Sequence, residues 1–393
     1  MQLTETQNAI RDMYRSYMTN ELEPRTEAFE SGEESVFPFM KKMIKDLGLD
    51  VAVDQMFNSD DSSSAKDESE KPTGGEDMKA LADFAQAQLI IEVSRINPGF
   101  QQSFGVSVGL CGGNIAMRGT AFQKEKYARP LMKGEKVGCW CLTEPGAGSD
   151  AFGSMKSKVR REGDHYVMNG SKTFITNGPD GDIFLVYARN EEDNSIQAFI
   201  LEREFEGLST GKPFKKMGMR CSPTSEVFFD NVRIPLENIL GGGNSDRDHV
   251  RKSLSRERMG ISIMGYAIAE RCFEIARDYA KEREQGGQPI ANYQLIQNRL
   301  ARMYIDVANA RRIVYGTVDS SQELSALDAS AAKLYLAEVG TRVATEAIHI
   351  LAGYGYMEEY KVERLMRDAM LLELGGGTTE IQILTIARHI LAT

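Results

Sequence analysis

Two changes in the spacing of apolar residues divide this chain of 393 residues into three parts. Residues 1–135 have apolar positions at helical spacing. Residues 136–240 instead carry short β-prone runs, such as 182–188 and 197–201, that are bounded by Gly, Asp, Asn or Pro. Helical spacing then returns over 241–393. The order predicts an α+β chain with an N-terminal helical domain, a middle β-domain and a C-terminal helical domain.

Long periodic stretches fill the last part of the chain. The predicted helices cover 246–284, 293–322, 326–352, 360–371 and 379–391. The first part is interrupted at residues 58–77, which are rich in Asp, Glu and Ser and contain almost nothing apolar. Because such a segment cannot offset its ordering entropy, we expect a mobile acidic loop. A docking segment for a basic partner is the alternative that its charge leaves open.

Charge and cysteine content restrict the partners. Acidic residues exceed basic ones, 57 against 47, and the net charge is −10, so no nucleic-acid partner is expected. The five cysteines do not resemble a disulfide framework, and Cys139 and Cys141 lack a second pair or a histidine cluster for zinc. No apolar run approaches the ~20 residues that span a bilayer, and the first residues resemble no targeting segment. We expect a cytoplasmic protein without a bound metal or a membrane partner.

A glycine-containing loop follows the β-prone run at 137–142 and ends near Ser149. Glycines allow backbone N–H groups to turn toward a bound group, and the hydroxyls of Thr143 and Ser149 add donors. These features suit an anionic or heteroaromatic ligand. An ordinary strand-to-turn connection explains the same residues equally well.

Several strings resemble the acyl-CoA dehydrogenase family and occur in the order of that family. They are GCWCLTEPGAGSD at 138–150, NGSKTFITNG at 169–178, KMGMRCSPT at 216–224 and LMRDA at 365–369. The resemblance implies a small β-domain between two helical domains, the second of them a four-helix bundle. It also implies an FAD-dependent oxidoreductase that acts on acyl-CoA, passes electrons to an electron-transfer flavoprotein and assembles as a homotetramer, a dimer of dimers.

The resemblance assigns site residues at several places along the chain. Those implied to bind FAD are Trp140, Leu142, Thr143, Gly148, Ser149, Phe174, Thr176, Arg283, Gln294, Gly353, Thr378 and Glu380. Arg283 and Gln294 would reach the FAD of a neighbouring subunit. Ser149, Ser255 and Arg258 are implied to contact the substrate.

The glycine run at 375–377 precedes a predicted capping box, in which Thr379 and Gln382 open the last helix. Exposed N–H groups at a helix start attract phosphate. A plain helix cap is the alternative interpretation of this segment.

The reaction requires a base, because an α-proton must leave while a hydride passes from the β-carbon to flavin N5. Many members of the family have a Glu where this chain has Gly376. In the isovaleryl and long-chain branches the base instead lies in a Leu-x-x-Glu-Arg string, which corresponds here to the string that begins at Leu254 and contains Glu257. The resemblance also implies that the Gly376 N–H and a flavin ribityl hydroxyl hold the thioester carbonyl.

The residues around Glu257 give independent support for this role. At 3.6 residues per turn Glu257 shares a helix face with Leu254, Ile261, Met264 and Ile268, so an acid projects from an apolar stripe. Burial without a cation raises a carboxylate's pKa toward the range useful to a base. A structural ion pair with Arg256, Arg258 or another basic residue is the alternative.

Two other functions remain compatible with the sequence. The chain could be a non-catalytic partner subunit of the same fold, or a flavin-dependent oxidase or monooxygenase. The acyl chain of the substrate is not encoded in a recognisable motif, although Gly375 and Gly376 leave room for a branched or large acyl group.

Overall fold

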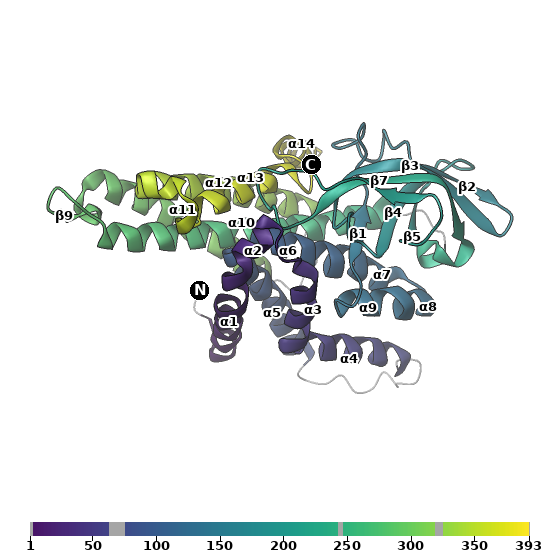
Figure 1. Cartoon of the computed structure of the whole chain (residues 1–393), viewed down its shortest axis with the longest axis horizontal. Coiled ribbons are helices and arrows are strands. Elements are labelled where there is room, and N and C mark those ends of the chain that lie inside the picture. Colours follow the sequence, from purple (N-terminus) through teal and green to yellow (C-terminus); the bar gives the residue numbers. More distant parts are fainter. Residues whose placement is uncertain (1–2, 63–74, 243–246, 319–324, 393) are drawn as a thin grey trace.

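A computed structural model describes residues 3–62, 75–242, 247–318 and 325–392. Three regions lie side by side in it: N-terminal helices, a β-sheet and a long helical bundle (Figure 1). The change of apolar spacing along the chain therefore corresponds to a change of architecture. Within the described residues, no helix combines the length and the apolar character needed to cross a bilayer.

Short helices and one long helix form the N-terminal region. They are α1 (Glu5–Tyr17), α2 (Thr26–Ser31), α3 (Val36–Asp46), α4 (Leu49–Ser62), α5 (Gly75–Ile96), α6 (Pro98–Phe104), α7 (Gly113–Arg118), α8 (Ala121–Gln123) and α9 (Arg129–Met132). Helix α1 begins with a capping box, in which Thr4 Oγ1 accepts from Gln7 N–H at 3.2 Å and Gln7 Oε1 accepts from Thr4 N–H at 3.0 Å. Buried aromatic residues, including Phe29, Phe39 and Phe100, form the core of this region.

The predicted acidic loop at 58–77 was too wide at both ends. Residues up to Ser62 belong to α4, and α5 already begins at Gly75. Negative charge near a helix start is favourable, which is compatible with the beginning of α5 at Gly75. The remainder of the predicted loop, 63–74, lies outside the described residues.

Seven strands form the middle sheet. They are β1 (Gly138–Cys141), β2 (Lys158–Glu162), β3 (His165–Thr176), β4 (Ile183–Asn190), β5 (Ile196–Glu202), β6 (Leu208–Thr210) and β7 (Thr224–Pro235). The strand order is β1-β4-β2-β3-β7-β6, with β5 also paired to β4. Strand β4 pairs in parallel with β1 and β2, and the other pairs are antiparallel. Residues 183–188 are all buried, which explains why the sequence of β4 is a continuous apolar run.

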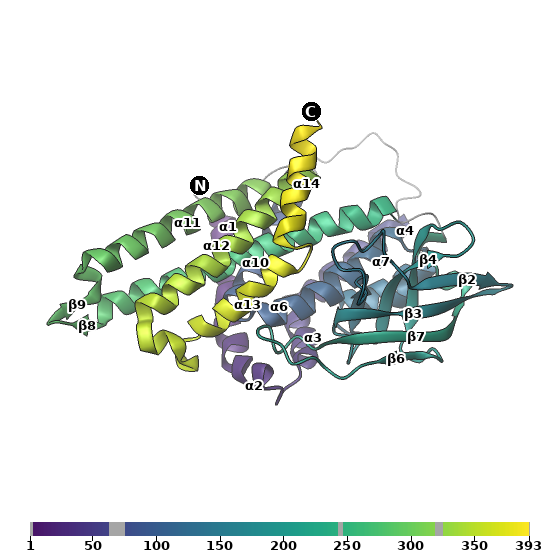
Figure 2. The ribbon, with the colours of Figure 1, turned by 90° about the horizontal axis from the view of Figure 1, so that it is seen from above.

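The last part of the chain is a bundle of long helices. They are α10 (Arg247–Glu282), α11 (Gln294–Val318), α12 (Ala326–Leu351), α13 (Val362–Leu374) and α14 (Thr379–Leu391), with a two-stranded hairpin of β8 (Glu284–Gln285) and β9 (Gln288–Pro289) after α10. Helices α10 and α12 pack closely at Gly265, where an added Cβ would lie 2.3 Å from the carbonyl oxygen of Leu336. Helix α14 leaves the bundle and points away from it (Figure 2).

Buried charges join α5 to α10. Arg95, on α5, donates to Glu270 at 2.6 Å and to Glu274 at 2.5 Å, both on α10. Arg95 is 5% exposed and also lies 3.4 Å from Glu92, so the loss of its partners on α10 would leave a buried group of charges only partly paired. This contact fixes the N-terminal region against the helix that carries Glu257.

Candidate active site

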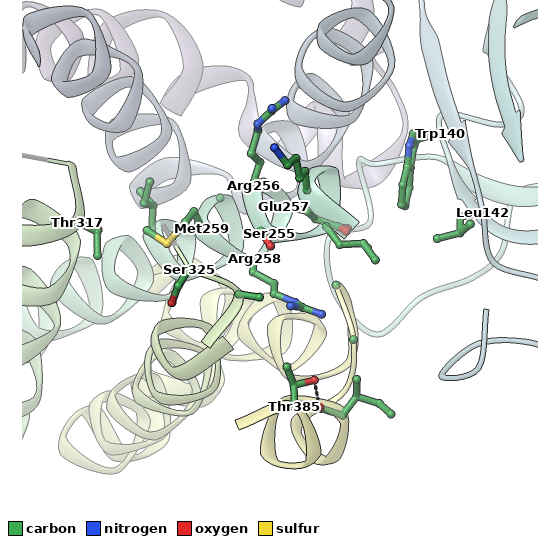
Figure 3. A pocket seen from close by; sticks show the side chains of 18 of the residues that line it. Trp140, Leu142, Ser255, Arg256, Glu257, Arg258, Met259, Thr317, Ser325 and Thr385 are labelled. Atoms are coloured by element: carbon green, nitrogen blue, oxygen red, sulfur yellow. Dashed lines mark hydrogen bonds between the residues drawn. The ribbon is translucent and has the colours of Figure 1, made fainter. Parts of the chain in front are cut away.

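A cavity of about 1040 Å³ lies where the loop after β1 approaches α5, α10, the turn at 375–377 and α14. Figure 3 shows Glu257 and its neighbours on α10 facing this space, with Trp140 and Leu142 on the side of the sheet. Nine of the predicted site residues line it, and they come from three separate parts of the chain. These residues are Trp140, Leu142, Thr143, Gly148, Ser149, Ser255, Glu257, Arg258 and Gly376.

A buried ion pair holds the loop after β1. Lys172, on β3, is fully buried and its Nζ donates to Glu144 Oε1 at 2.8 Å and to the Leu142 carbonyl at 3.1 Å. The carboxylate of Glu144 also accepts from the N–H groups of Lys156 at 2.6 Å and Ser157 at 2.9 Å. The loop that carries Thr143, Gly148 and Ser149 is therefore anchored to the sheet at its first residues.

Glu257 is the most perturbed group in the cavity. Ile261, Met264 and Ile268, which share its helix face, are buried in the core. Its Oε2 atom is buried and has no hydrogen-bond partner. Burial raises the pKa of Glu257 to about 7, although the charges of Arg258 and then Lys333 act in the opposite direction. A carboxylate with this pKa is suited to accept a proton near neutral pH.

The alternative of a structural ion pair is not supported for Glu257. Arg258 instead donates from Nη1 to Ser330 Oγ, on α12, at 3.2 Å. In the described part of the chain, no cation lies within 4.0 Å of the Glu257 carboxylate. The group is therefore free to act on a ligand in the cavity.

Gly376 lies directly beside Glu257. A Cβ added at Gly376 would be 3.7 Å from Glu257 Cδ and 2.5 Å from Ile261 Cδ1. The residue also has φ +63°, in the left-handed region that favours glycine. The space that a Glu side chain at position 376 would need is thus taken by Ile261 and by the carboxyl group of Glu257.

Substituting Gly376 with Ala should destabilise the protein and slow its reaction with substrate. We expect a loss of about 1–2 kcal/mol from the left-handed backbone, with a smaller addition because the new Cβ must displace Ile261 Cδ1, the flexible end of that side chain. Gly48 is the matched control, because its φ is +67° and an added Cβ would meet nothing within 4 Å. Denaturant unfolding should therefore show a larger loss for G376A than for G48A, and equal losses would contradict the crowding at Ile261.

The predicted capping box at Thr379 was wrong. The N-cap of α14 is Thr378, whose Oγ1 accepts from Ile381 N–H at 3.4 Å. Gln382 does not complete a box. Its side chain is buried and donates from Nε2 to the carbonyls of Gly376 at 3.1 Å and Gly377 at 2.8 Å. Gln382 thereby fixes the turn that carries Gly376.

Other predicted FAD residues lie outside the lining of this cavity. Phe174 is 69% exposed with φ +57°, and its ring lies 5.7 Å from that of Phe214. Thr176 pairs with Thr224 at the end of β3. Thr378 and Glu380 lie at the start of α14, next to lining residues. None of these four side chains is part of the cavity wall.

Arg283, Gln294 and Gly353 line a second cavity, of about 1010 Å³. It lies near the hairpin of β8 and β9, at the end of the bundle that is remote from the sheet (Figure 1). The Arg283 guanidinium lies 5.6 Å from the centre of the Tyr354 ring. Five of the residues predicted to bind FAD thus line the first cavity, and these three line the second.

Sequence reasoning missed several residues at the first cavity. Ala87 and Ile90 of α5, and Arg388 and His389 of α14, line it. Lys333, on α12, is fully buried beside the turn at 375–377. The available signal for Lys333 was a single charged residue on an Ala- and Leu-rich stretch of α12, which predicts a polar group on a buried face.

Comparison with known proteins identifies this helical, β and helical architecture as that of an oxidoreductase that acts on acyl-CoA. The acyl-CoA dehydrogenase middle domain matches residues 139–232, and the acyl-CoA dehydrogenase C-terminal domain matches 248–391. The chain belongs to the acyl-CoA dehydrogenase family. It is 36% identical over 393 residues to the short-chain specific acyl-CoA dehydrogenase of Clostridium acetobutylicum, covering 99% of this chain and 98% of that protein.

Solved structures agree with this assignment. Butyryl-CoA dehydrogenase from Megasphaera elsdenii superposes with a TM-score of 0.86 at 31% identity, covering 100% of this chain and 99% of the other. A chain from a structural study of the electron transferring flavoprotein of Acidaminococcus fermentans gives 0.85 at 30% identity, covering 100% of both. The chain is an FAD-dependent enzyme that dehydrogenates acyl-CoA, and the predicted fold class and cofactor are confirmed.

The first cavity fits the ring end of FAD. Trp140 and Leu142 provide a flat apolar wall, and Trp140 is held by its Nε1 donating to Tyr187 OH at 3.2 Å. Gly146 and Gly148 have open space around them, so their loop can approach a bound group closely. Glu257 lines the same space, and its Oε2 atom is buried without a hydrogen-bond partner.

Proposed function

We propose that this chain oxidises a saturated acyl-CoA to the 2-enoyl-CoA with Glu257 as the base that removes the α-proton. The observation that carries the proposal is the carboxyl group of Glu257, whose Oε2 atom is buried without a hydrogen-bond partner, next to a glycine at position 376. Because a side chain is absent at position 376, a substrate α-carbon can lie against the carboxylate of Glu257.

The residues that line the cavity have separate roles in the proposed reaction. The Gly376 N–H donates a hydrogen bond to the thioester oxygen and stabilises the negative charge that develops there, which makes the α-proton more acidic. Glu257 removes that proton, and its apolar surroundings keep water from competing for it. Thr143 and Ser149 orient the bound groups from the side of the sheet. FAD, when bound, supplies the acceptor for the hydride that leaves the β-carbon.

Anaerobic titration with acyl-CoA esters tests this function. Bleaching of the flavin absorbance at stoichiometric acyl-CoA, with formation of the 2-enoyl-CoA, is the expected result. A panel of straight, branched and aryl-substituted acyl groups would identify the substrate. No bleaching with any member would favour a non-catalytic partner subunit, and rapid reoxidation of the reduced flavin by oxygen would favour an oxidase.

The pH dependence of flavin reduction follows from the pKa of Glu257. The carboxylate must be ionised to act as a base, so the rate constant for reduction should rise with pH through about 7 and level off above it. Stopped-flow measurements at saturating substrate between about pH 6 and about pH 9 would test this. A rate constant that is flat over that range would contradict the assignment of the base.

We infer a homotetramer, a dimer of dimers, that passes electrons to an electron-transfer flavoprotein. The division of the predicted FAD residues between two cavities supports an assembly in which a second chain completes each site. The similarity to a chain studied with an electron transferring flavoprotein supports the acceptor. Cys111, Cys139, Cys141, Cys221 and Cys272 are all free and buried, which supports a reducing, cytoplasmic location.

A further inference from the structure

The buried ammonium group of Lys333, on α12, holds the turn between α13 and α14 by hydrogen bonds. Lys333 has no exposed surface, and its Nζ donates to the Gly377 carbonyl at 2.8 Å and to the Glu373 carbonyl at 3.3 Å. These two carbonyls lie on either side of Gly376. A buried ammonium is costly unless its donors are satisfied, so the two hydrogen bonds tie Lys333 and the turn together.

The turn needs such an anchor because its backbone is unusual. Gly376 has φ +63° and Gly377 has φ +90°, so two successive residues lie in the left-handed region. The Gly377 carbonyl accepts from both Lys333 and Gln382. Lys333 on α12 and Gln382 on α14 therefore both hold the turn. Together these contacts restrict the orientation of the Gly376 N–H.

Charged groups from three further elements act on Lys333. Glu257 and Arg258 come from α10, Glu373 from α13 and Glu380 from α14. Burial lowers the pKa of Lys333 to about 8, and the charge of Glu257 is the largest effect that opposes this. In return, the Lys333 charge favours the ionised form of Glu257. Of the described residues, no carboxylate lies within 4.0 Å of Lys333, so its ammonium is held mainly by backbone carbonyls.

We propose that Lys333 is a positioning residue for the dehydrogenation: it fixes the turn so that the Gly376 N–H faces the thioester oxygen opposite Glu257, and its charge keeps Glu257 ready to accept a proton. The inference rests on the proposed roles of Gly376 and Glu257. Lys333 itself is not part of the cavity wall, so it acts through the turn and through Glu257.

Substituting Lys333 with Met tests the proposal, because Met keeps much of the volume and removes the charge and the donors. We expect the rate constant for flavin reduction to fall by about 10- to 100-fold, since a small misplacement of a reacting group has effects of this size. The dissociation constant of the saturated acyl-CoA should change little, because the oxyanion contact strengthens only in the transition state. The rising limb of the pH profile should move to higher pH.

A matched control separates this role from folding alone. Lys216, in the middle region, also donates to backbone, at the Ser222 carbonyl, and burial lowers its pKa to about 8 as well. Both K333M and K216M should lower the unfolding temperature. Only K333M should move the pH profile, and K333R should restore part of the rate. An unchanged pH profile in K333M with a rate constant within about twofold of wild type would overturn the proposal.

Binding of acetoacetyl-CoA separates failure of this inference from failure of the proposed base. At a pH at which acetoacetyl-CoA is already the enolate in solution, its α-proton has gone to the solvent, so its binding tests how the turn holds a negative thioester oxygen without proton transfer to Glu257. K333M should weaken enolate binding, seen by its absorbance, more than binding of a saturated acyl-CoA, whether or not Glu257 is the base. If K333M does not fold with FAD, K333Q keeps a donor and takes its place. Equal weakening for both ligands, or failure of both variants to fold, would assign Lys333 to stability alone.

Discussion

Replacing Glu257 with Gln should lower the rate constant for flavin reduction by acyl-CoA about 10²- to 10⁴-fold, the range that a general base supplies. Gln has nearly the same shape, but it cannot accept the α-proton. The buried atom that lacks a partner, Oε2, means that no existing hydrogen bond is broken by the change. Stopped-flow reduction under anaerobic conditions at saturating substrate measures the effect.

Retention of structure must be shown in the same experiment. E257Q should keep its FAD content and its affinity for the 2-enoyl product, because neither depends on a proton acceptor. Glu237, an exposed residue after β7, is a suitable control, and E237Q should reduce flavin at the wild-type rate. If E257Q reduces flavin as fast as wild type, another group is the base.

Replacing Lys172 with Met should cause the largest loss of stability, about 3–5 kcal/mol, because it leaves a buried carboxylate unpaired. Lys172 and Glu144 have side chains that are 0% and 4% exposed. The loss should be measured by denaturant unfolding of the holoenzyme. The anchor of the loop after β1 is removed as well, so FAD should dissociate more readily from K172M.

An exposed ion pair on the same sheet provides the comparison. Lys158 pairs with Glu191 at 2.5 Å, but the Lys158 side chain is 56% exposed. K158M should therefore cost no more than about 1 kcal/mol. A double variant in which Glu144 is also replaced with Gln should recover part of the loss in K172M. Equal unfolding free energies for K172M and K158M would show that the buried pair does not anchor the sheet.

Much of the fold could be predicted because it depends on local pattern. The run at 182–188 corresponds to β4 (Ile183–Asn190), and the stretch at 326–352 corresponds to α12 (Ala326–Leu351). The helix face of Glu257 could also be predicted, because residues three and four apart share a face whatever they pack against. Its buried surroundings follow from the apolar residues on that face.

The contacts that depend on distant segments could not be predicted. The buried ammonium group of Lys333 is satisfied by backbone carbonyls of a turn some forty residues later in the chain. The local spacing of residues around Lys333 does not encode that contact. Whether Thr378 or Thr379 is the N-cap depends on which of the two residues has non-helical backbone angles. The flexible glycines before Thr378 are compatible with both possibilities. The turn places Thr378 at φ −58° and ψ 163°, so Thr378 caps the helix.

The placement of Arg283, Gln294 and Gly353 has a consequence for handling the enzyme. If one FAD contacts these three residues of one chain and Trp140 of another chain, the affinity of the protein for FAD depends on the association of the two chains. Dilution should then release the coenzyme before any helix unfolds, and activity lost at nanomolar protein should return on concentration with added FAD. Holding the coenzyme would be a shared property of the assembly and not of the single polypeptide.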